Sequence, residues 1–309
     1  MQSMKMKSKK SAFALAIVIW IVAALLLGIA FIMNLANDNL KTTKVLDSKL
    51  KTRLEAISVI EVLKYAMLTS NYDSQSIFLQ EKLPYDIPKH LFLDGRNYKI
   101  EKGIEFTLQD TSALLSVFHP NFELLARFAT DNREQYFAIK DSVWDWIDED
   151  NIVRLNGAES SFYKFKRSAQ YGPRNYSAIQ SINELRLVNG VYDLSDEKWK
   201  KLKKFLSLDG SSNMNVVLMK RFLLQKLLKL SDSQSTILES YKKTDMNKFY
   251  RKVEASRNYD NEVMSFALSF VIDVNLTVND NRAATNIESM IRFKKLQDNR
   301  ILVKSYKIY

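Results

Sequence analysis

The sequence predicts an α+β fold, in which a long N-terminal helix packs on an antiparallel sheet and an all-α module is inserted into that sheet. Three observations predict it. An apolar run near the N-terminus continues into an amphipathic helical pattern, short alternating segments lie on either side of a helical stretch, and the residues from 264 onward return to alternation. With 309 residues, only 7 Gly and only 4 Pro, the chain has room for one large domain or two modest ones and for few flexible linkers.

The N-terminal apolar run is long enough to cross a membrane. No charged residue occurs between Lys10 and Asp38, and residues 12–33 are nearly all apolar. As a helix they would rise about 33 Å, against a hydrocarbon core of about 30 Å, whereas a cleaved secretory signal has an apolar region of only about 7–15 residues. Lysines precede the run at positions 5, 7, 9 and 10, so the positive-inside rule places the N-terminus in the cytoplasm and the rest of the chain across the membrane.

The helical pattern continues past the membrane surface. Apolar residues follow at steps of three and four, with charged residues between them: Leu46, Leu50, Leu54, Ile57 and Ile60 or Glu61. Neither Pro nor Gly occurs from Phe31 to Asn71, which predicts one continuous helix of about 55 residues, half of it outside lipid. The stripe needs a partner, and the pattern leaves two open: a sheet of the same chain or neighbouring copies of the helix.

Short strands are expected on both sides of a helical block. Residues 72–90 contain Pro84 and Pro88 and are expected to be irregular, two or three strands are expected within residues 91–108, and residues 121–252 are mostly helical. Three C-terminal strands are expected to join the early strands in one sheet laid on the long helix. The expected organisation is a basic leader (1–12), a membrane helix (13–34), a helix with the first strands (35–118), an inserted helical domain (119–250) and the C-terminal strands (251–309).

Composition and motifs give no sign of an enzyme. The chain has no Cys, so disulfides, zinc thiolates and thiol nucleophiles are excluded, and its two His are far apart. No Gly-rich phosphate loop, Gly-x-Ser-x-Gly or His-Glu-x-x-His sequence occurs. Paired carboxylates for glycoside hydrolysis are conceivable, but nothing else in the sequence indicates a sugar cleft. We predict no enzymatic activity.

An acidic cluster is the candidate metal site. Asp145, Asp148, Glu149 and Asp150 lie close together at the end of a predicted helix. Oxygen-rich clusters suit Ca²⁺, so these four residues are candidate calcium ligands. The alternative is a solvated helix end without an ion.

A basic hairpin region suggests a second function. Residues 185–190 resemble half of a helix-hairpin-helix, a motif that holds phosphates through backbone N–H groups, and lysines follow at positions 198, 200, 201, 203 and 204. With a net charge of +11, this supports a membrane-anchored DNA-binding or DNA-uptake protein as an alternative. Such hairpins usually need two glycines, and here Gly190 is followed by Val191, so a helical protein-binding module is favoured and no nucleic-acid partner is expected.

Five segments resemble the K-class minor pseudopilins of type II secretion, also called general secretion pathway protein K. They are in the family's order and cover nearly the whole chain. The matching segments are residues 13–19 after the basic run, Asp110 to Leu115, Val143 to Asp150 with residues 157–159 and Tyr163, Tyr171 with Asn175, Ser181, residues 183–188 and Gly190, and Asn213 to Asn215. The sequence departs from the family pattern at Ala113, which replaces a glycine, and at Ala12, where a leader peptidase expects glycine.

The resemblance implies a role in a bacterial inner membrane, with the C-terminal part in the periplasm. It implies leader cleavage between Ala12 and Phe13, which the glycine departure leaves open, and packing of the membrane helix through Ala14, Leu15 and Ile17. It also implies a SAM-like insert and a capping role at the tip of a pseudopilus that helps to export folded proteins. The implied partners are the I-class and J-class minor pseudopilins, the major pseudopilin, the prepilin peptidase and the inner-membrane secretion platform.

Most pseudopilins carry Glu at the fifth mature position, where it pairs with the amine of the subunit above. Here that position is Ile17, as expected of the K class. An unpaired carboxylate in lipid would cost several kcal/mol, and a tip subunit has no amine above it.

Overall fold

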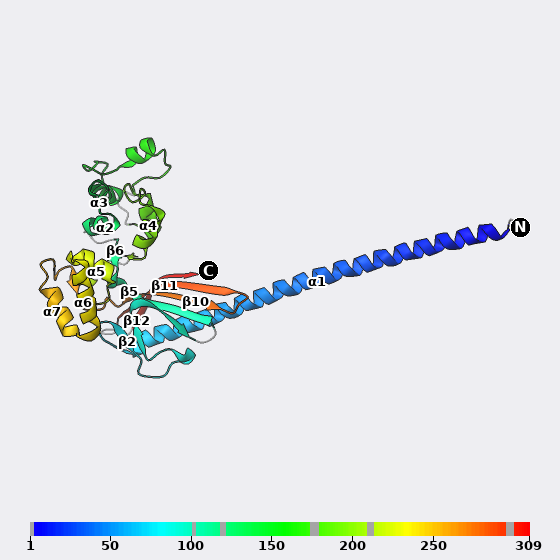
Figure 1. The fold of residues 1–309 in the computed structure, drawn as a ribbon, viewed down its shortest axis with the longest axis horizontal. Helices are drawn as coiled ribbons and strands as arrows, with labels where there is room; N and C mark the ends of the chain where they lie inside the picture. Colours follow the sequence, from blue (N-terminus) through cyan, green and yellow to red (C-terminus); the bar gives the residue numbers. More distant parts are fainter. Residues whose placement is uncertain (1–2, 101–102, 118–121, 174–178, 209–212, 295–299) are drawn as a thin grey trace.

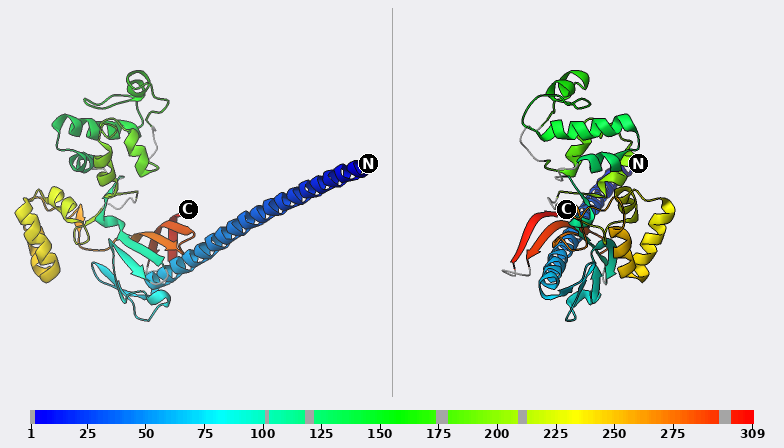
Figure 2. Two further views of the ribbon diagram at one scale, coloured as in Figure 1. Left: turned by 45° about the vertical axis from the view of Figure 1, so that its right-hand side comes forward. Right: turned by 90° about the vertical axis from the view of Figure 1, so that its left-hand side faces the viewer.

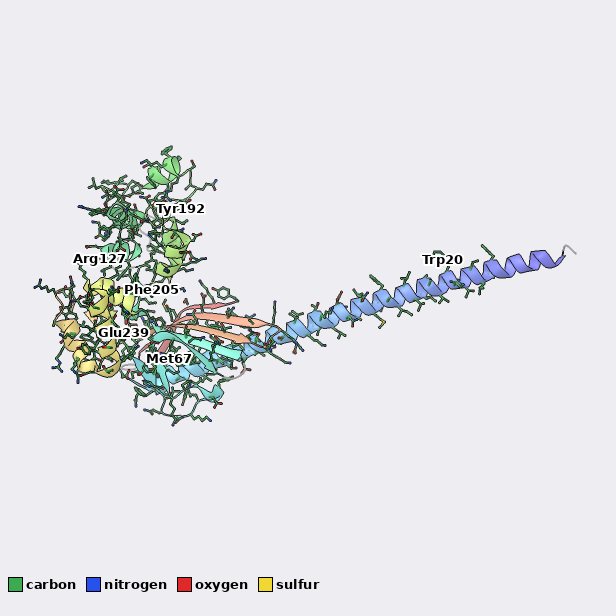
Figure 3. All side chains as sticks on the ribbon, viewed as in Figure 1. Trp20, Met67, Arg127, Tyr192, Phe205 and Glu239 are labelled. Atoms are coloured by element: carbon green, nitrogen blue, oxygen red, sulfur yellow. The ribbon has the colours of Figure 1, made fainter. Side chains whose placement is uncertain are left out.

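The long N-terminal helix is the dominant feature of the molecule (Figure 1). A computed structural model describes residues 3–100, 103–117, 122–173, 179–208, 213–294 and 300–309. Helix α1 runs without a break from Ser3 to Thr69, longer than the sequence pattern predicts, since it takes in the leader as well. Its first half projects freely from the rest of the chain, and Trp20 points into open space at 77% exposure (Figure 3).

A five-stranded antiparallel sheet covers the second half of α1. The strand order is β12-β11-β10-β5-β4, and α1 contacts β10 and β11. The strands are β4 (Asp94–Ile100), β5 (Ile104–Asp110), β10 (Val271–Asn279), β11 (Ala284–Lys294) and β12 (Arg300–Ile308). The predicted joining of early and C-terminal strands is confirmed, because β5 pairs with β10 antiparallel, with Phe106 opposite Leu276. Figure 2 shows the sheet lying along the helix.

Alternation along the central strands supplies one hydrophobic core. On β5, the residues Ile104, Phe106 and Leu108 are buried, while the residues between them are partly exposed. They pack with Val274 and Leu276 of β10 against buried residues of α1, which are Ala56, Val59, Ile60, Leu63, Ala66 and Met67. This core joins the helix to both groups of strands.

Residues 72–90 were predicted to be irregular, and this was wrong in part. A small three-stranded sheet is formed by β1 (Asn71–Tyr72), β2 (Ser76–Phe78) and β3 (His90–Phe92), with the 3₁₀ helix η1 (Pro84–Asp86) between β2 and β3. The strands are too short for an alternating pattern to reveal them.

A second core lies in the part of the chain between β5 and β10. It is built mainly from helices, around buried residues such as Trp146, Tyr163 and Phe249. The elements are η3 (Thr111–Ala113), β6 (Leu115–Ser116), α2 (Phe122–Ala129), α3 (Arg133–Ile147), the π-helix η4 (Phe162–Lys166), the 3₁₀ helix η5 (Ile182–Leu187), α4 (Asp196–Lys203), β7 (Leu206–Ser207), β8 (Met214–Asn215), α5 (Arg221–Leu228), α6 (Asp232–Thr244), α7 (Met246–Glu254) and β9 (Met264–Ser265).

The predicted α+β class with a long apolar N-terminal helix is confirmed. The region from 119 to 250 is not purely helical, because β7 and β8 pair in parallel with β6 and β9 outside it. The domain boundaries at 119 and 250 and the SAM-like character of the insert stay predictions.

One buried carboxylate joins the two places where the chain leaves and re-enters the sheet. Asp110, at the end of β5, is fully buried. It accepts hydrogen bonds from the backbone N–H and hydroxyl of Ser112 at 2.8 and 2.6 Å, and from the backbone N–H and hydroxyl of Ser269 at 3.0 and 2.6 Å. Asp110 therefore links the end of β5 to the segment just before β10.

Candidate functional site

The exposed half of α1 is the first candidate site. Among the described residues, α1 from Phe13 onward is the one helix long and apolar enough to cross a membrane, and none of its most apolar stretch is buried. The exposed apolar residues continue past that stretch along one stripe, with Leu46 at 60%, Leu50 and Leu54 at 57% and Ile57 at 36% exposure. We call these four residues the outer stripe.

The sheet covers a different face of the helix. Ser48 and Thr52 are buried there, and they bind the β10–β11 turn region: Thr52 hydrogen-bonds Thr285 at 2.9 Å, and Ser48 donates to Asp280. At about 100° per residue, Thr52 lies about 160° around the helix from Leu50 if measured the short way. Of the stripe that the sequence predicts, Ile60 is buried in the core with the sheet, whereas the outer stripe is not covered by the sheet of the same chain.

The acidic cluster at the end of α3 is the second candidate site. Helix α3 begins after the N-cap Asn132, whose side chain accepts from Gln135 N–H at 2.9 Å. It ends at Ile147, and the backbone N–H of the C-cap residue Asp148 donates to Trp144 O. The following loop returns so that Asp148, Asp150 and Glu159 come together, with one carboxylate oxygen from each lying within 4.8 Å of the others. We call these three residues the carboxylate trio.

Glu159 is the member of the trio that the sequence analysis did not name as a ligand. The residue is 2% exposed, and within the described part of the chain neither of its carboxylate oxygens has a hydrogen-bond partner. Burial, followed by repulsion from Asp145 and Asp148, raises the pKa of Glu159 to about 7. A buried charge without a partner is costly, so this side chain calls for a cation or a proton.

The trio fits a hard divalent cation. Two oxygens that each lie about 2.4 Å from one calcium ion are at most about 4.8 Å apart, and the three oxygens here all lie within 4.8 Å of one another. Among the residues that the structure describes, one oxygen of Asp148 is also buried without a hydrogen-bond partner. These residues could hold the ion, and its charge would offset the like charges that burial brings together.

The other two predicted ligands lie outside the trio. Asp145 is fully buried, and its carboxylate accepts from Arg154 through Nη1 at 2.9 Å and through the backbone N–H at 3.2 Å. Arg154 also pairs with Asp148, so it partly neutralises the site from one side. Glu149 is exposed and is not grouped with the trio.

The loop needs glycine at position 157. A Cβ added there would lie 1.9 Å from Oδ2 of Asp145, far closer than van der Waals contact permits. Gly157 therefore lets the loop pass over the Asp145 carboxylate and carry Glu159 into the trio.

The glycine of the basic hairpin region faces the protein interior. Gly190 has a φ of +80°, and a Cβ there would meet Ile139 of α3 at 2.8 Å. Its carbonyl accepts from Gln135 at 3.0 Å. A glycine packed against α3 is not presenting backbone N–H groups to a phosphate, so the structure does not favour the DNA-binding alternative.

Some residues of the family resemblance have defined structural roles. Asp110 joins the two chain crossings, Tyr163 packs edge-on against Trp146 with centroids 5.2 Å apart, and Asn215 accepts from Val217 N–H at 2.9 Å. Asn175 lies outside the described residues.

A membrane-length helix is half covered by an antiparallel sheet, and its outer stripe is left exposed. Residues 120–209 match the family model described as Type II secretion system (T2SS), protein K. The fold is similar to that of a chain in the crystal structure of the GspK-GspI-GspJ complex from enterotoxigenic Escherichia coli. That likeness has a TM-score of 0.53 at 16% identity, and covers 89% of this chain and 99% of that one. No curated protein sequence matches the chain. The family match and the fold together support a K-class minor pseudopilin of type II secretion.

Proposed function

We propose that this chain is a capping subunit at the tip of a type II secretion pseudopilus, where it initiates assembly and helps to export folded proteins. The observation that carries the proposal is the outer stripe. Four large apolar residues continue the membrane helix into water, and the chain's own sheet leaves them exposed. An exposed apolar stripe of this kind marks a protein interaction surface, and an amphipathic helix of another subunit would cover it.

The expected partners on this stripe are the I-class and J-class minor pseudopilins. The related structure is a complex of those three classes, which supports the assignment. The major pseudopilin, the prepilin peptidase and the inner-membrane platform are further expected partners of any subunit that enters such a fibre.

Cysteine cross-linking tests this directly, because the chain has no Cys of its own. A single cysteine replaces Leu50 on the outer stripe, and a second cysteine is scanned along the helix of the co-expressed I-class or J-class partner. Lys51→Cys is the matched control, since Lys51 is exposed but lies about 100° further around the helix. We expect disulfide-linked pairs from Leu50→Cys and not from Lys51→Cys; equal yields from both would reject the stripe as the contact.

Ile17 tests the tip position. It is 45% exposed within the apolar span. Glu at this position would require an amine from a subunit above, which a capping subunit does not have, so Ile17→Glu is expected to abolish incorporation. Normal secretion by a strain carrying Ile17→Glu would count heavily against the capping role.

The proposed topology places the N-terminus in the cytoplasm and everything after the span in the periplasm. The span fits a single-pass inner-membrane anchor, and the lysines before it supply the positive-inside signal. A membrane-impermeant maleimide added to intact spheroplasts is expected to label Lys51→Cys. Labelling only after lysis would show the opposite orientation, with this part of the chain in the cytoplasm.

We further propose that the carboxylate trio binds Ca²⁺. The two unpartnered oxygens of Glu159 support it, together with the 4.8 Å limit on the spacing of the three carboxylates. The ion would hold the loop from Asp148 to Glu159 against the end of α3.

A further inference from the structure

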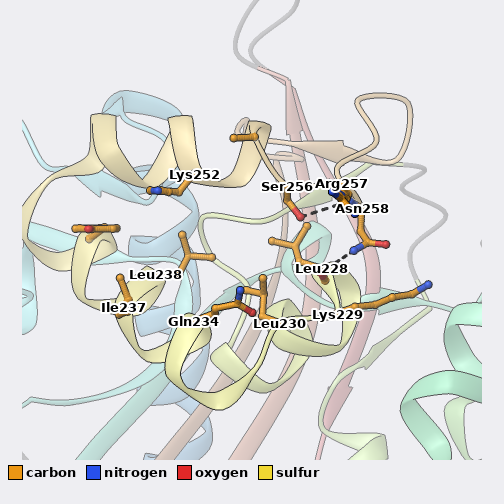
Figure 4. Close-up of a pocket in the computed structure, with 12 residues that line it drawn as sticks. Leu228, Lys229, Leu230, Gln234, Ile237, Leu238, Lys252, Ser256, Arg257 and Asn258 are labelled. Atoms are coloured by element: carbon orange, nitrogen blue, oxygen red, sulfur yellow. Dashed lines mark hydrogen bonds between the residues drawn. The ribbon is translucent and has the colours of Figure 1, made fainter.

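A pocket at the end of the molecule far from the membrane carries a separate inference. It lies between α5, α6 and α7 and has a volume of about 550 Å³ (Figure 4). Volumes of this size are typical of binding sites. Figures 1 and 2 show these three helices at the opposite end from the N-terminus, and the pocket shares no residue with the outer stripe or the carboxylate trio.

The floor of the pocket is apolar. It is formed by Leu228, Leu230, Ile237 and Leu238, with the ring of Tyr241 beside them. Leu228 and Leu238 are buried, whereas Ile237 is 52% exposed. A half-exposed isoleucine beside buried leucines is a place where an apolar side chain of a partner gains from leaving water.

The rim of the pocket is basic. Lys229, Lys252 and Arg257 line it and are exposed, and none of the three makes an ion pair within the part of the chain that the structure describes. The surrounding segment, residues 221–258, has nine Lys and Arg against four Asp and Glu. Cations around an apolar floor are complementary to acidic side chains that flank bulky apolar ones.

The walls of the pocket are fixed before any partner arrives. The side chain of Asn258 donates to Leu228 O at 3.0 Å, which links the segment after α7 to the end of α5. Lys229 ends α5 in the left-handed region at φ 53°, a conformation that costs a lysine energy, and this turn brings Lys229 and Leu230 to the pocket. At the start of α6, Ser231 and Gln234 form a reciprocal capping box. A preformed site binds without the cost of ordering its walls.

We propose that this pocket binds a short segment of a partner protein in which acidic residues flank bulky apolar residues. A protein segment is favoured over a membrane surface because of position. The 35 residues of α1 between the span and Thr69 alone would reach about 50 Å from the bilayer, and α5–α7 lie beyond the end of that helix. The inference goes beyond the capping role, since it assigns a contact by a surface that the outer stripe does not include.

The test is selection of phage-displayed random peptides of about 12 residues on the full chain in lipid nanodiscs. We expect enriched peptides to contain Leu, Ile or Phe flanked by Asp or Glu. We expect the double variant Lys252→Glu/Arg257→Glu to weaken their binding at least about tenfold. Raising the salt concentration should reduce peptide affinity less for this variant than for the unmodified chain, because the variant lacks the two cations. Ile237→Asp, which adds a charge to the floor at an exposed position, is expected to have a similar effect.

Lys243→Glu is the matched control, because Lys243 is exposed on α6 and does not line the pocket. It makes the same charge change as each of the two substitutions in the double variant and is expected to alter affinity by less than about twofold. Two results would overturn the proposal: enriched peptides without the acidic and apolar pattern, or enriched peptides that bind the Ile237→Asp and double variants as tightly as the unmodified chain. The proposal would also be overturned if selection on the unmodified chain enriched no peptide above the level reached in selection on the Ile237→Asp variant.

Discussion

Calcium should stabilise the protein by binding the buried carboxylate of Glu159. The substitution Glu159→Gln should remove calcium binding without lowering the stability of the metal-free protein. Glu159 is 2% exposed, and its two carboxylate oxygens have no hydrogen-bond partner among the residues that the structure describes, so its charge destabilises the metal-free protein. At a calcium concentration about 100 times the dissociation constant, binding adds about 2.7 kcal/mol. For a chain of this size, 1 kcal/mol corresponds to about 2–4 °C, so the unfolding midpoint should rise by about 5–10 °C.

The assay is tryptophan fluorescence during heating of the full chain in detergent, with calcium or with chelator. Glu159→Gln should lose the calcium-dependent rise, yet unfold in chelator at a temperature no lower than the unmodified chain, because it removes a buried unpaired charge. Glu149→Gln is the control: it removes a neighbouring carboxylate that is exposed and outside the trio, and should keep the rise. The reasoning is refuted if Glu149→Gln and Glu159→Gln respond to calcium alike, or if the unmodified chain does not respond at millimolar calcium.

Three further substitutions have expected outcomes. Asp110→Ala removes the acceptor of four buried hydrogen bonds and should lower the free energy of unfolding by about 3–5 kcal/mol, as measured by urea denaturation. A decrease of less than about 1 kcal/mol would be inconsistent with its role in linking the two chain segments. Gly157→Ala places a Cβ 1.9 Å from Asp145 Oδ2, so the loop must shift. Calcium affinity measured by calorimetry should fall at least about tenfold. An unchanged affinity would show that the loop does not position the carboxylate trio. Leu50→Asp should reduce co-purification with I-class and J-class partners at least about tenfold without changing the unfolding midpoint. Lys51→Asp should have little effect on either quantity. Equal co-purification of the two variants would show that the outer stripe is not the partner contact.

The sequence indicated the sheet because apolar and polar residues alternate along β5 and along β10 from Ile272 onward. Ile104, Phe106 and Leu108 alternate with polar residues, and so do Val274, Leu276 and Val278, which identifies both strands and the face that each buries. Their pairing follows from the need to cover one helix with one sheet. The predicted pairing of the early and C-terminal strands is therefore a consequence of pattern and topology.

The face of α1 that binds the sheet could not be predicted in the same way. Leucines at 46, 50 and 54 stand out as the apolar stripe, but the first contacts with the sheet are made by the small polar residues Ser48 and Thr52. Small side chains permit a close approach of helix and strands, and their hydroxyls find partners in the β10–β11 turn region. Because such residues resemble a solvated face, periodicity alone assigns them to the surface.

The carboxylate trio was predicted in part for a related reason. Asp148 and Asp150 are neighbours in sequence, so their proximity was evident, while Glu159 joins them only through the path of the loop between. The Gly157-Ala158-Glu159 segment was recognised as a family signature without a physical role. A glycine two residues before a buried acidic side chain is the signal that could have indicated the loop's return.

Asp110 also has a consequence for how the protein can change. The chain leaves the sheet at β5 and returns before β10, and both crossings hydrogen-bond the same carboxylate. The two ends of the intervening 158 residues are therefore held side by side, as in segments that can be replaced by others whose own ends lie together. Related chains could therefore differ extensively in the helical body, and in the surfaces that it offers to partners, while the long helix and the five-stranded sheet stay the same.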